Sequence, residues 1–76
     1  MDYILVSLQT GHGAPYDLKV PTFVLVDELI PMLIEALGLN IPPQAQLQAE
    51  PIGKILSKQR TLEQEGVRHG ALLTLI

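Results

Sequence analysis

The chain contains no cysteine, and this absence narrows its chemistry at once. Disulfide bonds, a thiolate nucleophile and cysteine-held zinc or iron–sulfur sites are all excluded. The 76 residues must therefore be stabilised by apolar burial, and 47% of them are hydrophobic. A chain of this length is near the lower limit at which one core suffices, so we interpret residues 1–76 as a single domain.

Long hydrophobic runs are missing as well. No segment approaches the roughly 18 to 20 apolar residues that a membrane-spanning helix needs, because acidic residues and Pro31 interrupt the most apolar stretch, 24–39. The N-terminus also lacks the basic, hydrophobic and small-residue regions of a signal peptide. We therefore expect a cytoplasmic protein that does not insert directly into a membrane.

Groups that carry catalysis or bind metals are sparse. Neither His12 nor His69 has a paired acid beside it, and we interpret both as exposed loop residues. Ser7 and Ser57 lack an adjacent base and a glycine motif suited to an oxyanion. The sequence thus predicts that the protein is not an enzyme and holds neither metal nor cofactor.

Charge is small in total and unevenly placed. The net charge is −3, with six acids against Lys19 alone in residues 1–53 and four bases against two acids in residues 54–76. The basic end invites a nucleic-acid interpretation, but no aromatic residues are interleaved with its bases. We interpret it as an ordinary solvated surface and expect no nucleic-acid partner.

The first 21 residues predict a β-hairpin. Residues 3–10 alternate, with Ile4, Val6 and Leu8 on one side of a half-buried strand. Residues 11–15 contain two glycines and a proline, which is turn chemistry. A second alternating run follows and ends at Pro21; its inward side chains are expected to be Tyr16, Leu18 and Val20.

An amphipathic helix is predicted next. Its apolar stripe has the 3.6-residue period of one helix face and comprises Val26, Leu29, Ile30, Leu33 and Leu37. Met32 and Ile34 flank this stripe, and Gly38 is suited to end the helix. Pro31 conflicts with the pattern because it deletes a backbone hydrogen bond. We expect either a kinked first turn or a regular helix that starts near Ile30.

The remaining sequence returns to short strands. Residues 46–50 and 54–56 are predicted strands joined by a turn, residues 61–66 predict one helical turn, and residues 71–76 form the last strand. This order predicts an α+β fold in which one main helix crosses a mixed sheet of five strands, possibly four. The last strand is expected to lie in the centre, parallel to the first, with Leu73 and Leu75 inward.

The order of elements resembles ubiquitin, a β-grasp fold. The likeness covers nearly the whole chain and rests in sequence on Ile41-Pro42-Pro43, Gly53-Lys54, Arg60-Thr61-Leu62 and the spacing of Leu73 and Leu75. A closer resemblance is to the ubiquitin-like YukD/EsaB family of bacterial type VII (WXG100/ESX) secretion loci. It is carried by the segment 16–21, by the helix that follows, and by Gly70-x-Leu72-Leu73-x-Leu75.

This resemblance implies a non-catalytic accessory or regulatory protein that acts through non-covalent contacts. The implied partner is a protein of the secretion machine, either its ATPase or a membrane component. Covalent conjugation is not expected, because the sequence contains no Gly-Gly and Ile76 belongs to the last predicted strand.

Two alternatives follow from related proteins. The N-terminal ubiquitin-like domain of the membrane channel component shares the Gly66-Val67-x-x-Gly70 and Leu72-Leu73-Thr74-Leu75 patterns, although Met1 just before strand one favours a whole protein. A covalent modifier or sulfur carrier is the other alternative, and the missing tail disfavours it.

Apolar side chains on the outer side of the predicted sheet are the best candidates for partner binding. Leu5, Leu72 and Ile76 should point away from the helix, on adjacent central strands, and form one docking surface bordered by Lys54 or Arg68. They can also be single exposed apolar residues, which are normal, and Lys54 can simply keep an edge strand soluble. The strand that carries Ile76 also makes a homodimer possible.

Overall fold

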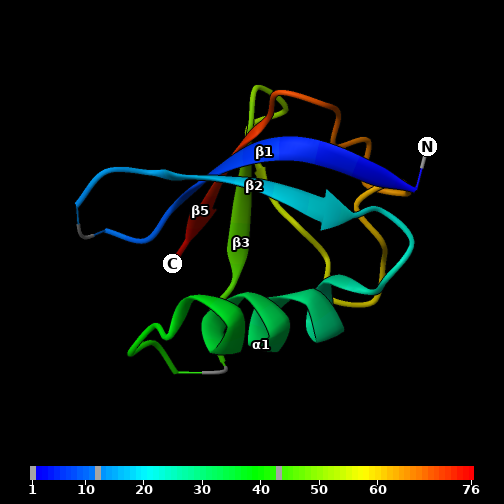
Figure 1. The fold of residues 1–76 in the computed structure, drawn as a ribbon. Helices are drawn as coiled ribbons and strands as arrows, with labels where there is room; N and C mark the ends of the chain where they lie inside the picture. Colours follow the sequence, from blue (N-terminus) through cyan, green and yellow to red (C-terminus); the bar gives the residue numbers. More distant parts are fainter. Residues whose placement is uncertain (1, 12, 43) are drawn as a thin grey trace.

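The computed structural model describes residues 2–11, 13–42 and 44–76. One helix lies across one side of a five-stranded mixed sheet (Figure 1), which confirms the predicted α+β fold. The strands are ordered β2-β1-β5-β3-β4. In chain order the elements are β1 (Tyr3–Gln9), β2 (Tyr16–Pro21), α1 (Val26–Leu37), β3 (Leu47–Glu50), β4 (Lys54–Ile55) and β5 (Leu72–Leu75).

Strand β5 lies at the centre of the sheet, as predicted. It runs parallel to β1, with Ser7 opposite Leu72, and antiparallel to β3, with Leu47 opposite Leu75. β1 and β2 form the predicted antiparallel hairpin. The hairpin and the second half of the chain are therefore joined through one short strand.

Alternating side chains build the core between the sheet and α1. Leu8, Leu47, Ala49 and Leu73 are fully buried. Four residues of the helix stripe, Val26, Leu29, Ile30 and Leu33, are buried with them, whereas Leu37 is partly buried. Each large aliphatic side chain removed from water in this way contributes about 1.5–3 kcal/mol. Tyr16 was expected to point inward; it lies opposite Leu8, but next to the loop that closes the hairpin, where 38% of its surface is exposed.

The helix begins at Val26 and continues through Pro31, so of the two expected alternatives a start near Ile30 is wrong. The reason is a contact from far along the chain. No side chain caps the N-terminus of α1; instead, the N–H groups of Val26 and Asp27 donate to the carbonyl oxygens of Arg60 and Lys58, at 2.8 and 3.0 Å. These bonds satisfy donors that every helix start leaves unpaired.

The end of the helix follows the prediction. Gly38 adopts a left-handed φ of 62°, which costs glycine nothing, and the N–H of Leu39 donates to Ile34 at 2.9 Å. This pattern is a Schellman motif, and it turns the partly buried Leu39 back onto the core.

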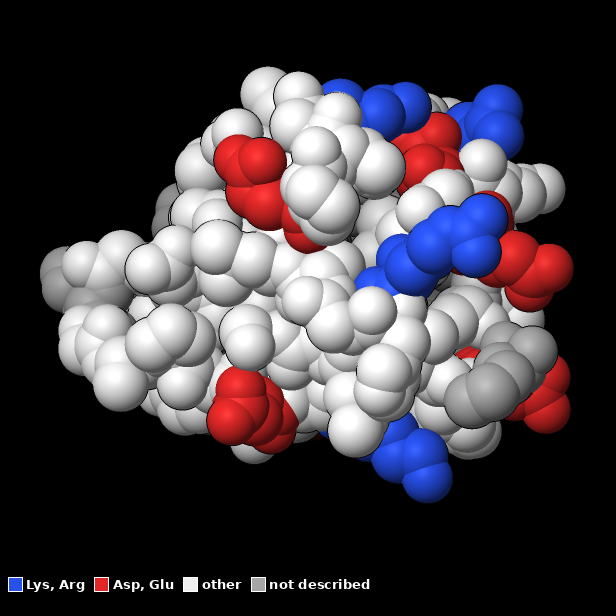
Figure 2. Space-filling model, turned by 90° about the horizontal axis from the view of Figure 1, so that it is seen from above, with Lys and Arg blue, Asp and Glu red and all other residues white. Residues whose placement is uncertain are grey.

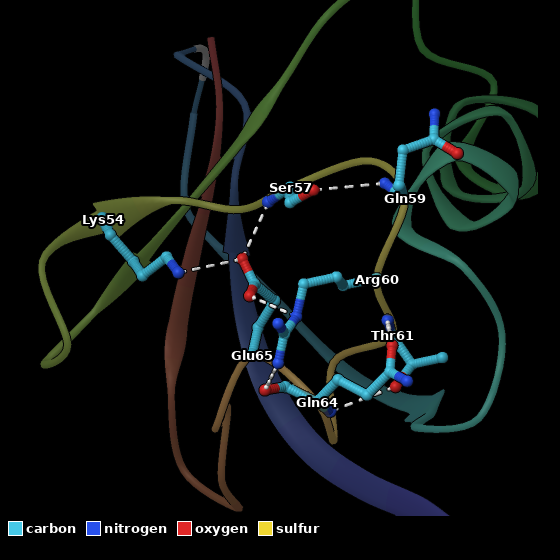
Figure 3. A network of polar contacts seen from close by, with 7 residues as sticks. All are labelled: Lys54, Ser57, Gln59, Arg60, Thr61, Gln64 and Glu65. Carbon is cyan, nitrogen blue, oxygen red and sulfur yellow. Dashed lines mark hydrogen bonds and ion pairs between the residues drawn. The ribbon is translucent and has the colours of Figure 1, made fainter.

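Residues 61–66 form hydrogen-bonded turns, including one helix-like bond from the N–H of Glu65 to the carbonyl of Thr61. Thr61 caps these turns. Its hydroxyl accepts from the N–H of Gln64 at 3.1 Å, and its own N–H donates to the side chain of Gln64 at 2.9 Å (Figure 3). This reciprocal arrangement is a capping box.

Replacing Pro31 measures how much this residue destabilises α1. The substitution Pro31→Ala supplies an N–H to the carbonyl of Asp27 and relieves the ring clash, and Pro31 is exposed, so little packing is lost. We expect the free energy of unfolding, measured by urea denaturation, to rise by about 1–3 kcal/mol. The control Pro15→Ala changes an exposed loop and should lower it by about 0.4–1 kcal/mol. Equal effects of the two substitutions would contradict the account.

Candidate protein-binding face

The side of the sheet that faces away from α1 is open to solvent, and we call it the outer face (Figure 1). Figure 2 looks onto this side and shows a mostly uncharged surface, on which basic and acidic side chains are scattered instead of gathered by sign. The strand pattern explains this surface. In β1 the buried residues alternate with Tyr3, Leu5, Ser7 and Gln9, whose side chains take the other direction.

An exposed apolar cluster lies at the beginning of β1. Tyr3, Leu5 and Phe23 are 44%, 51% and 58% exposed, and we call them the N-terminal patch. The rings of Tyr3 and Phe23 meet edge to face, with centroids 6.2 Å apart, and Leu5 follows Tyr3 on the same side of the strand. Contiguous exposed apolar groups of this kind are typical of surfaces that bind other proteins.

Lys19 borders this patch. It lies directly opposite Leu5 in the hairpin, and its Nζ stands 5.3 Å from the centroid of the Tyr3 ring. A cation–π contact at an exposed site is worth about 0.5–1 kcal/mol. It orients the ring and places a positive charge at the rim of the patch.

The segment before β5 forms the opposite border. The N–H of Leu5 donates to Nδ1 of His69 at 3.2 Å, and the N–H of Gly70 donates to the carbonyl of Leu5 at 2.7 Å. Arg68 is exposed and lines a hollow of about 490 Å³ beside the turn that contains Ile52. His69 is exposed, as expected, and its ring also accepts a hydrogen bond from the backbone of β1. His12 lies outside the described residues.

The structure brings together only part of the predicted docking surface. Leu72 lies opposite Ser7, so Leu5 is its diagonal neighbour on the outer face. Ile76 is four residues beyond Leu72, about 13 Å along the strand, and about 20 Å from Leu5. Leu72 is also half-buried, whereas Ile76 is 53% exposed. The three residues therefore do not form one contiguous patch.

Lys54 does not border the outer face. It lies opposite Ala49, which is fully buried on the helix side, and its Nζ is 3.1 Å from Oε2 of Glu65. Arg68 precedes His69, whose ring accepts from Leu5, and it lines the hollow beside the turn that contains Ile52. Whether any of these residues contacts a partner stays a prediction.

Tyr3 and Phe23 are the members of the patch that the sequence analysis did not select. The outward direction of Tyr3 is plain from the alternation of β1, but Phe23 lies in the connection before α1 and belongs to no periodic pattern. The sequence does hold one indication that Phe23 is exposed. It is the single phenylalanine of the chain, and it belongs neither to the alternating residues of the hairpin nor to the apolar stripe of the helix.

A buried carboxylate lies away from the patch, between β4 and the turns that follow it (Figure 3). Only 3% of the Glu65 side chain is exposed. Its oxygens accept from the N–H of Ser57 at 2.8 Å and pair with Lys54 at 3.1 Å and with Nε of Arg60 at 3.0 Å. From sequence alone, an acidic residue in a turn such as Glu65 is expected to be solvated, and for Glu65 this expectation is wrong.

The contacts of Glu65 lower its pKa below the usual value of 4.5. The largest cause is the backbone hydrogen bond from Ser57, which opposes the effect of burial, and the two basic side chains add to it. Because all of these contacts join the network internally, they support a structural role for Glu65 and leave it no free oxygen for proton transfer.

The lowered pKa of Glu65 makes the stability of the protein depend on pH. A pKa that is lower in the folded than in the unfolded chain adds stability above the unfolded value, and this stability is lost as the pH falls through the folded value. We expect Glu65→Gln to lower the free energy of unfolding by about 1–3 kcal/mol at pH 7. The difference from the unsubstituted protein should shrink below about pH 4.5.

The matched control is Glu63→Gln, at an exposed position two residues away. It should change the stability by less than about 0.5 kcal/mol. Urea denaturation at several pH values measures both variants. An effect of Glu65→Gln that does not depend on pH would contradict the role assigned to the carboxylate.

Among the described residues, no group of three or more His, Asp or Glu side chains is placed to hold a metal ion. No helix in the described part of the chain is long and apolar enough to cross a membrane.

Solved structures share this fold. A designed protein based on ubiquitin is 25% identical, with a TM-score of 0.76, over 99% of this chain and 88% of its own. The ubiquitin of Caldiarchaeum subterraneum is 24% identical, with a TM-score of 0.72, over 97% and 91%. A ubiquitin-like domain from Arabidopsis thaliana is 18% identical, with a TM-score of 0.79, over 100% and 78%. None of the curated proteins searched matches the chain.

These likenesses confirm the predicted ubiquitin-like β-grasp fold. The family is shown by a different comparison, which covers almost the whole chain. Residues 3–75 match the model of the WXG100 protein secretion system (Wss) protein YukD. The chain therefore belongs to the YukD family of WXG100 secretion system proteins.

Proposed function

We propose that this protein is a cytoplasmic, non-catalytic accessory subunit of a WXG100 secretion system and binds another component of the machine without covalent transfer. The partner is the secretion ATPase or a membrane component. The N-terminal patch is the contact surface, together with the adjoining part of the outer face around Leu72.

The observation that carries this proposal is the exposure of Tyr3, Leu5 and Phe23 as one cluster. Two aromatic rings and a leucine at 44–58% exposure give up burial that a domain this small can use for its own stability. Tyr and Phe are also enriched in the buried cores of protein interfaces. A partner that covers the patch recovers this burial.

The border of the patch indicates what the partner offers. Lys19 and Arg68 are both exposed: Lys19 lies opposite Leu5 on β2, and Arg68 precedes His69, which bonds to Leu5 on the other side of β1. A complementary surface has an apolar centre and acidic groups at its rim. The family and the patch together favour docking, a function that needs no reacting group.

Co-purification from the host that encodes the chain tests this proposal. The tagged protein is isolated with and without a denaturing wash, and bound proteins are identified by mass spectrometry. We expect a secretion ATPase or membrane component that is lost on denaturation. A partner that survives denaturation would show covalent attachment and contradict the proposal.

A pair of variants tests the surface itself. Phe23→Ser removes an exposed ring, and we expect it to weaken capture of the partner at least tenfold, the equivalent of about 1.4 kcal/mol. The control Ile55→Ser changes a side chain of the same chemistry, 48% exposed, on β4 opposite Gln48. It should leave capture unchanged. Circular dichroism checks that both variants fold, and equal losses for the two would reject the patch.

A further inference from the structure

Strand β2 forms one edge of the sheet and, among the described strands, pairs with β1 alone. A hydrogen bond just beyond β2 shows which of its N–H and C=O groups face β1 and which face the open edge. The N–H of Thr22 donates to Asp2, and the even-numbered residues of β2 therefore turn their N–H and C=O groups toward β1. Asp17 and Lys19 consequently turn theirs toward the open edge, and Pro21 offers a carbonyl there.

An apolar groove lies beside this edge, between β2 and α1. Its volume is about 180 Å³, below the 300–1,000 Å³ typical of small-molecule sites and suited to one or two side chains. Exposed Met32 and Ala36 stand at its opening. The residues that line it include Leu18, Val20, Leu29, Met32, Leu33 and Ala36.

The edge and the groove have complementary geometry for one kind of ligand. An extended chain that pairs with Asp17 and Lys19 sends alternate side chains to the helix side of the sheet, where the groove lies. Its main chain gains hydrogen bonds, and its inward side chains gain apolar contact. A globular surface cannot enter a groove this small.

Charge indicates what flanks the apolar residues of that ligand. Glu28 and Glu35 lie four residues before and three residues after Met32, so they share its face of the helix. Both are exposed. Residues 1–53, which include β2 and α1, carry six acids against Lys19 as their one base. The helix side of the groove therefore favours basic residues at the ends of the bound segment.

We propose that the β2–α1 groove binds an extended segment of a partner polypeptide, with aliphatic residues at alternate positions and Lys or Arg at its ends, as an added strand on β2. A second copy of this chain fits less well. Edge-to-edge pairing of two β2 strands brings two α1 helices side by side, with their Glu28 and Glu35 side chains close together. The groove lies on the helix side of β2, apart from the N-terminal patch, and does not depend on it.

A designed peptide, acetyl-KKITVTIKK-amide, is the probe, and ¹⁵N-labelled protein reports its position by NMR. We expect chemical-shift changes confined to β2 and α1, and slower hydrogen exchange at the amides of Asp17 and Lys19. A control peptide with the central valine replaced by proline keeps the charge but loses strand pairing, and it should bind at least tenfold more weakly.

Two matched variants separate the groove from simple charge attraction. Ala36→Lys places a long basic side chain in the groove, whereas Ala14→Lys adds the same charge at an exposed position in the hairpin loop. Fluorescence anisotropy of a labelled peptide should show at least a tenfold weaker affinity for Ala36→Lys and less than a twofold change for Ala14→Lys.

Three results would overturn the proposal. Equal weakening by the two lysines means that charge alone attracts the peptide. Shift changes centred on Tyr3 and Phe23 place the peptide on the N-terminal patch. Shift changes at β2 that depend on protein concentration, without peptide, make a second copy the occupant.

Discussion

The fold depends on the pairing of β5 with its two neighbours. Four residues, Leu72–Leu75, hydrogen-bond in parallel to β1 and antiparallel to β3, and thereby join the hairpin to the second half of the chain. The same strand inserts Leu73 and Leu75 into the core and leaves Leu72 half-buried on the outer face. The positions of the outer-face residues of β5 and β3 relative to the N-terminal patch are therefore fixed by this pairing.

The loops around the sheet depend on polar contacts between segments distant in sequence. Carbonyls of residues 58–60 complete the start of α1, and Glu65 joins β4 to the turns after it. These contacts hold the segment before β5, from which His69 bonds to Leu5. The N-terminal patch is thus supported by the buried carboxylate as well as by the sheet.

Sequence periodicity predicted the strands, the helix and the central place of β5 because side-chain alternation and the 3.6-residue stripe are local properties. Periodicity gave wrong predictions where contacts between residues distant in sequence determine the local structure. The helix starts at Val26 in spite of Pro31 because carbonyls more than 30 residues away accept its first N–H groups. The burial of Glu65 depends on bases that the turns bring together, and no local pattern signals this. The separation of Ile76 from Leu5 could not be seen without the register of β1 and β5.

The protein then has two surfaces suited to different ligands, an apolar patch for a folded partner and a strand edge for an extended one. The central claim, that the N-terminal patch meets a secretion component, is tested most directly by photo-crosslinking in the host. Benzoyl-phenylalanine is placed at Phe23 or, for comparison, at Ile55, which is also exposed. The account predicts a crosslink to the secretion ATPase or a membrane component from Phe23 alone. A crosslink to that component from Ile55 and none from Phe23 would contradict it.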